Sequence, residues 1–123
     1  MLKLVGLGLR EGDISLRGVE AVRESDVAYA ELYTNSIDYD LEALEERAGT
    51  PVREVERREV EDEDLIVEEA REREVAFLVS GDPLAATTHQ DILFRARSED
   101  IETEVVHAPS VFTAVAETGL SLY

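Results

Sequence analysis

Runs of apolar residues alternate along the chain with segments whose apolar residues recur at helical spacing. The apolar runs predict five strands, at residues 2–9, 26–31, 51–55, 75–79 and 103–107. The run at 75–79 is apolar throughout, as expected of a central strand that is buried on both faces. Charged residues interrupt the run at 51–55, so we expect this strand near an edge of the sheet.

The segments between these strands predict helices. We expect them at residues 13–24, 41–48 and 61–73, from Pro83 to about Ala96, and at 110–119. Asp82 is expected to cap the helix that begins at Pro83, and Gly49 stands where glycine commonly ends a helix. Strands that alternate with helices imply a parallel sheet with right-handed crossovers. We therefore predict an α/β fold, a Rossmann-like doubly wound domain with a five-stranded, mostly parallel sheet.

The net charge of the chain indicates the salt concentration to which it is adapted and the kinds of partner it can bind. The chain has 12 basic and 29 acidic residues, a formal net charge of −17, and Lys3 is its only lysine. At about 1 M salt the Debye length falls to roughly 3 Å, so most of the resulting self-repulsion disappears. Acidic residues spread along the whole chain therefore predict adaptation to the molar salt of a halophile's cytoplasm. The same charge argues against nucleic acid as a partner, because phosphate contacts need basic clusters.

Several kinds of chemistry find no support in the sequence. The absence of cysteine excludes disulfides and thiolate chemistry. No segment has the pattern of a signal peptide, and no apolar run approaches the length that spans a bilayer, so we expect a cytoplasmic protein without a membrane partner. No side chains have metal-ligand spacing and no nucleophile has an evident base partner, so we predict no metal site and name no catalytic residue.

Three loops are expected at the carboxyl edge of the sheet, which is where open α/β sheets bind ligands. These loops are residues 6–9, 81–85 and 108–111, and their small residues allow a ligand to approach the backbone closely. The first loop lacks the full dinucleotide-binding pattern, because Glu11 stands where a third glycine is expected. The loops therefore predict a site for a small ligand and leave its identity open.

The polar residues near these loops each have a structural alternative. For Asp82 and Ser110 the structural alternative is a role as a helix cap and nothing more. His89 shares a helix face with Ile92, so a partly buried structural histidine is the simpler interpretation. His107, beside a strand end, fits either a structural or a chemical role.

Four parts of the chain carry a resemblance to a known family: residues 5–9 with 13–15 and 18–21, residues 29–34, residues 81–89 and residues 107–111. Gly81-Asp82-Pro83 is shared by the wider tetrapyrrole methylase superfamily. The continuation Ala-Thr-Thr-His at 86–89 and the block His-Ala-Pro-Ser at 107–110 resemble the diphthine synthases in particular. The resemblance covers essentially the whole chain, and the acidic composition makes it a resemblance to the haloarchaeal type.

The resemblance implies S-adenosyl-L-methionine as the cofactor, bound in a cleft between two domains. Members of the family are roughly twice this length, so residues 1–123 would form their N-terminal α/β domain, with the second domain absent from this chain. Carried over by motif, the cofactor-binding residues would be Leu9, Asp82, Ala85, Ser110 and Val111. Leu9 and Ala85 would give apolar or backbone contacts, while Asp82 and Ser110 would supply polar ones.

The reaction implied by the resemblance is methylation of the amino group on the 3-amino-3-carboxypropyl histidine of elongation factor 2. The family's homodimer is expected to carry over, and the 123-residue chain alone is expected to be inactive. Another methylase of the superfamily, with a corrinoid or RNA substrate, is the first alternative. The acidic surface disfavours RNA, and the block at 86–89 disfavours corrinoids. A non-catalytic unit that only folds and dimerises is the second alternative.

Overall fold

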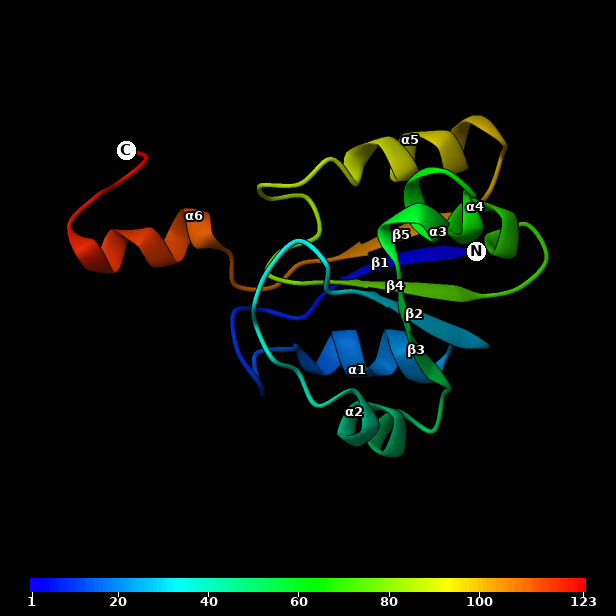
Figure 1. The fold of residues 1–123 in the computed structure, drawn as a ribbon, viewed down its shortest axis with the longest axis horizontal. Coiled ribbons are helices and arrows are strands. Elements are labelled where there is room, and N and C mark those ends of the chain that lie inside the picture. The colour runs from blue at the N-terminus through cyan, green and yellow to red at the C-terminus, as the bar shows by residue number, and fades with distance from the viewer.

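The predicted parallel α/β sheet is present in the computed structural model, which describes residues 1–123 (Figure 1). Its five strands are β1 (Leu2–Gly6), β2 (Val27–Glu31), β3 (Val52–Val55), β4 (Val75–Val79) and β5 (Thr103–Val106). They lie in the order β3-β2-β4-β1-β5, and every neighbouring pair is parallel. The all-apolar strand β4 is central and the charged strand β3 is at an edge, so both of these predictions are confirmed.

Helices cover both faces of the sheet. They are α1 (Leu16–Arg23), α2 (Leu41–Ala48), α3 (Arg57–Glu61), α4 (Leu65–Ala70), α5 (Gln90–Ser98) and α6 (Val111–Ala114), with a 3-10 helix, η1 (Val115–Thr118), directly after α6. Figure 1 shows α1 and α2 on one face and α3, α4 and α5 on the other. None of these helices has the length and apolar character that a membrane-spanning segment requires.

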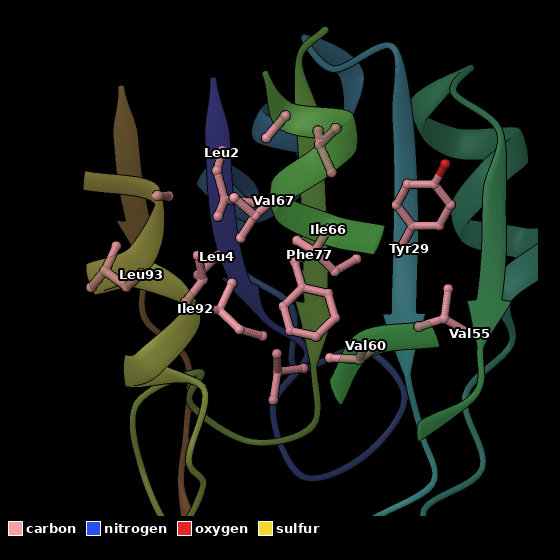
Figure 2. Close-up of a cluster of buried hydrophobic side chains, with 14 of the residues drawn as sticks. Leu2, Leu4, Tyr29, Val55, Val60, Ile66, Val67, Phe77, Ile92 and Leu93 are labelled. Carbon is pink, nitrogen blue, oxygen red and sulfur yellow. The ribbon is translucent and has the colours of Figure 1, made fainter. Parts of the chain in front are cut away.

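The sheet divides the core into two layers, because successive side chains of a strand point to opposite faces. On β4, Val75, Phe77 and Val79 join the cluster beneath α3, α4 and α5, while Ala76 and Leu78 join the cluster beneath α1 and α2. Figure 2 shows the first cluster, in which the Phe77 ring lies beside Ile66 of α4 and Val60 of α3. Full burial of β4 on both faces is what its continuous apolar sequence requires.

The prediction of one helix at residues 61–73 is wrong, because the structure has two short helices, α3 and α4, in this part of the chain. α3 ends at Glu61, and Asp64 adopts a left-handed conformation with φ of 55° before α4 begins. Val60 and Ile66 are both buried in the same cluster, at 2% and 1% exposure. In one continuous helix, residues six apart would lie on different faces, since each residue turns about 100°. The break at Asp64 lets both side chains reach the core.

The last predicted helix is confirmed in part. Ser110 caps α6, because its hydroxyl accepts a hydrogen bond from the Phe112 amide at 3.2 Å. The second half of the predicted helix is the 3-10 helix η1, which ends at Gly119 with a left-handed φ of 92°. No residue of α6 is buried, and Figure 1 shows this segment extending beyond the carboxyl edge of the sheet.

Because the chain carries a net charge of −17, we expect its melting temperature to rise steeply between about 0.1 and 2 M KCl, as screening removes self-repulsion. Thermal denaturation followed by circular dichroism at a series of salt concentrations measures this dependence. As a control, the double variant Glu42→Gln/Glu46→Gln removes two exposed charges of α2 and should weaken the dependence on salt. A melting temperature that stays flat over this range would contradict adaptation to molar salt.

Candidate ligand site at the carboxyl edge of the sheet

The loops that follow β1 and β4 are joined by backbone hydrogen bonds. The Leu7 amide donates to the Val79 carbonyl at 2.8 Å, and Gly8 and Gly81 exchange two bonds of 3.2 and 2.7 Å. Both glycines have positive φ, 76° and 65°, which residues with a side chain rarely adopt. The two loops therefore hold each other in a fixed shape at the carboxyl edge.

Gly6, the last residue of β1, brings the third loop into the same place. A Cβ atom added to Gly6 would lie 2.6 Å from the Gly81 carbonyl oxygen and 2.7 Å from the Ala108 Cβ. Both distances are far shorter than a carbon contact tolerates, so only glycine fits. The loops after β1, β4 and β5 thus converge on one point, as the sequence predicted for residues 6–9, 81–85 and 108–111.

Asp82 ties two of these loops together. One carboxylate oxygen, Oδ1, accepts the Leu84 amide at 2.9 Å. The other, Oδ2, accepts the Ala108 amide at 3.1 Å and lies 2.7 Å from Nδ1 of His107. The prediction that Asp82 caps a helix beginning at Pro83 is wrong, because the chain first makes turns and α5 begins only at Gln90. The carboxylate instead links the loop after β4 to the loop after β5.

The five residues expected to bind the cofactor all lie on these three loops or at the start of α6. Leu9 and Ala85 are half-buried, Asp82 and Ser110 are almost fully buried at 9% exposure each, and Val111 is 50% exposed. An open groove of about 460 Å³ lies between the first loop and α6, and its lining includes Leu9, Asp13 and Pro109. Of the five predicted residues, Leu9 lines this groove, and the other four lie on the neighbouring loops or at the start of α6.

A second polar cluster lies at the carboxyl end of β2. The Glu31 side chain is fully buried, and its carboxylate accepts hydrogen bonds from Nε2 of His89 at 3.1 Å and from the hydroxyl of Thr34 at 2.9 Å. The His89 ring is 5% exposed and packs edge-to-face on Phe77, with centroids 5.0 Å apart. This placement agrees with the interpretation of His89 as a structural histidine.

The charge of Glu31 is stabilised by these neighbours. Burial alone would raise the pKa of the Glu31 carboxyl, but hydrogen bonds from His89 and Thr34 outweigh it and hold that pKa below its ordinary value of 4.5. The sequence pattern does not single out Glu31 as a site residue. The only available signal was a single acidic residue at the end of an otherwise apolar strand.

A fourth loop, between β2 and α2, also reaches the carboxyl edge. The Tyr39 hydroxyl donates to the Gly8 carbonyl, and the Asn35 amide bonds to the Ser80 hydroxyl at 2.5 Å. These contacts brace the first two loops from the side of β2. Neither residue is marked by a local pattern, because residues 32–40 show neither strand nor helix periodicity.

The family described as Tetrapyrrole (Corrin/Porphyrin) Methylases matches residues 1–123, and the chain belongs to this family. The family resemblance found in the sequence is therefore confirmed.

The curated relatives are more specific. The diphthine synthase of Methanothermobacter thermautotrophicus is 44% identical, with 100% of this chain and 48% of the relative covered. The diphthine synthase of Archaeoglobus fulgidus is 43% identical, with 100% and 50% covered. A crystal structure of diphthine synthase superposes with a TM-score of 0.87 at 43% identity, covering 97% of this chain and 49% of that one. The chain thus spans about half the length of the curated relatives it matches.

Proposed function

We propose that this chain is the N-terminal, cofactor-binding domain of an S-adenosyl-L-methionine-dependent methyltransferase. Its acceptor would be the amino group of the 3-amino-3-carboxypropyl histidine of elongation factor 2, and its product diphthine. The observation that carries the proposal is the convergence of three loops on Gly6, locked by Asp82, in a chain more than 40% identical to diphthine synthases. The family description names corrin and porphyrin methylases, whereas the curated relatives reported above are diphthine synthases.

The residues at this edge suit a sulfonium cofactor. A carboxylate has about four lone-pair sites, and the partners of Asp82 within the chain, Leu84, Ala108 and His107, occupy three. One site is thus left for a polar group of a ligand. Leu9, which lines the groove, and Val111, which is 50% exposed at the start of α6, offer apolar surface on the neighbouring loops. The groove next to Leu9 falls within the range of about 300–1,000 Å³ that small-molecule sites occupy.

In this function the chain acts mainly by positioning. When bound, S-adenosyl-L-methionine supplies an electrophilic methyl group on a positively charged sulfur. The braced loops hold their shape before the ligand arrives, so binding costs little ordering of the backbone. Fixing the methyl donor against an acceptor amine converts a bimolecular reaction into an effectively unimolecular one, which is worth several orders of magnitude in rate. Gly6, Gly8 and Gly81 provide that rigidity.

We further propose that the working protein has a second domain and forms a homodimer in the cytoplasm. Residues on and after α6 support an additional apolar contact, because several large side chains there are exposed: Val111, Phe112, Leu120, Leu122 and Tyr123. Contiguous exposed apolar residues on one segment commonly mark a contact surface. The relatives, about twice as long as this chain, have the residues that a second domain requires.

The proposed function predicts methyl transfer by the full-length protein in molar salt. With labelled S-adenosyl-L-methionine, the label should enter elongation factor 2 that carries the 3-amino-3-carboxypropyl group and not the factor with unmodified histidine. The 123-residue chain alone should bind the cofactor no better than about millimolar, because each 1.4 kcal/mol of lost contacts weakens binding about tenfold. It should transfer no label.

Mass spectrometry of the modified factor counts the methyl groups and locates them on nitrogen or oxygen. Label in a corrinoid precursor or in RNA, with none in elongation factor 2, would overturn the proposed acceptor. Transfer by the 123-residue chain at the rate of the full-length protein would show that the second domain is dispensable.

A further inference from the structure

His107 differs from His89, the other histidine, in the ring nitrogen that has no hydrogen-bond partner. It directly follows β5, its side chain is 68% exposed, and its only hydrogen-bond partner in the chain is Asp82. His89 is buried and uses Nε2 to bond Glu31. In His107 the bonded nitrogen is Nδ1, so Nε2 has no hydrogen-bond partner within the chain.

The carboxylate decides which tautomer His107 adopts. A carboxylate oxygen only accepts, so at 2.7 Å the hydrogen must be on Nδ1 of the imidazole. The neutral ring then has an unprotonated Nε2 with a free lone pair. Asp82 is itself held in place by the amides of Leu84 and Ala108, so the ring is oriented by a fixed anchor.

The bond to His107 is not needed to join the two loops. The Ala108 amide already links the loop after β5 to Asp82, and the Gly6 contact packs Ala108 against β1. A ring that remains 68% exposed contributes little burial. An oriented imidazole with one open nitrogen is instead the arrangement that serves a proton acceptor.

We propose that Nε2 of His107 accepts the proton that the acceptor amine loses before it is methylated, with Asp82 as the positioning residue. This inference rests on the proposed function. An alkylammonium has no lone pair on nitrogen, so it cannot attack a methyl group. The N–H bond breaks, the proton moves to Nε2, and the electron pair stays on nitrogen, where it forms the new bond to carbon.

Charge is conserved in this proton transfer. A positive ammonium and a neutral imidazole become a neutral amine and an imidazolium, and the Asp82 carboxylate stabilises the imidazolium through Nδ1. The exposed ring edge then returns the proton to water. The charged side chains of the neighbouring groove, which Leu9 and Pro109 also line, are Arg10 and Asp13, which pair with each other at 3.8 Å, and Glu117 of η1.

The variant His107→Asn separates proton acceptance from structure. The asparagine amide nitrogen stands near the position of Nδ1 and can still donate to Asp82, but the side chain has no basic nitrogen. In the full-length protein we expect kcat for elongation factor 2 to fall about 100-fold at neutral pH, with the affinity for S-adenosyl-L-methionine and the melting temperature unchanged. The deficit should shrink as pH rises, because water deprotonates the amine without help.

A second measurement needs no activity. In nitrogen-15 spectra of the 123-residue chain, the neutral His107 ring should show a protonated Nδ1 and an unprotonated Nε2. With only two histidines in the chain, the His107→Asn variant assigns the signals. The opposite tautomer would overturn the inference, and so would full activity of His107→Asn or a deficit that is equal at every pH. An inactive wild-type protein would instead overturn the proposed function, and the inference with it.

Discussion

Replacing His89 by alanine is expected to lower the free energy of unfolding by about 3–5 kcal/mol, the range found when one partner of a buried polar pair is removed. The Glu31 carboxylate is fully buried, and without the imidazole only Thr34 remains to bond it. The edge-to-face contact with Phe77 is also lost. Urea denaturation at fixed salt concentration measures the change.

The variant His89→Gln is the matched control. The glutamine amide can place an N–H group near the position of Nε2, so it keeps a donor for Glu31 while losing the aromatic contact. We expect it to cost roughly half as much as His89→Ala. A loss of less than about 0.5 kcal/mol for His89→Ala, typical of surface substitutions, would show that the pair does not anchor the end of β2.

Substituting Gly6 by alanine is expected to cost about 2–3 kcal/mol, because an added Cβ overlaps two atoms that cannot easily move. One is the Gly81 carbonyl oxygen at 2.6 Å and the other the Ala108 Cβ at 2.7 Å. Relief of the overlap separates the loops after β4 and β5. On the proposed function, affinity for S-adenosyl-L-methionine should therefore fall by roughly tenfold or more, equivalent to about 1.4 kcal/mol. Calorimetry with the full-length protein measures it.

Gly12→Ala separates steric overlap from the mere loss of a glycine. Gly12 has φ of 92°, but an added Cβ meets no atom within 4 Å. The substitution should cost only the backbone strain, roughly 1 kcal/mol. In amide spectra, Gly6→Ala should shift Gly81 and Ala108, whereas Gly12→Ala should leave both in place. Unchanged spectra and stability for Gly6→Ala would show that the three loops do not meet at Gly6.

Local patterns predict the sheet well, because the burial of a strand determines which of its consecutive residues are apolar. The apolar run at 75–79 predicted both the strand and its central place, and the charges of 51–55 predicted the edge strand. The break between α3 and α4 was missed because it depends on Val60 and Ile66 reaching the same cluster from two directions. That requirement comes from tertiary packing, which overrides helix periodicity.

The candidate site was predicted only as far as its loops. Placing residues 6–9, 81–85 and 108–111 together needed nothing more than the parallel topology. The bonds that shape the site join residues distant in the chain: Asp82 and His107 are 25 residues apart, and Glu31 and His89 are 58 apart. No local pattern marks such a pair. Local patterns therefore predict a helix cap at Asp82 and do not single out Glu31.

The strand order has a consequence for how the chain reaches its native state during synthesis. β1 is made first, yet it lies between β4 and β5, with Leu2 opposite Val75 and Thr103. Until β4 has been made, at about two-thirds of these 123 residues, β1 has no partner strand, while β2 and β3 can already pair. Closing such long loops slows folding, and unpaired apolar strands invite aggregation in the meantime. The dense negative charge of the chain is also present on the nascent polypeptide. Incomplete chains therefore repel one another during the time in which β1 has no partner strand.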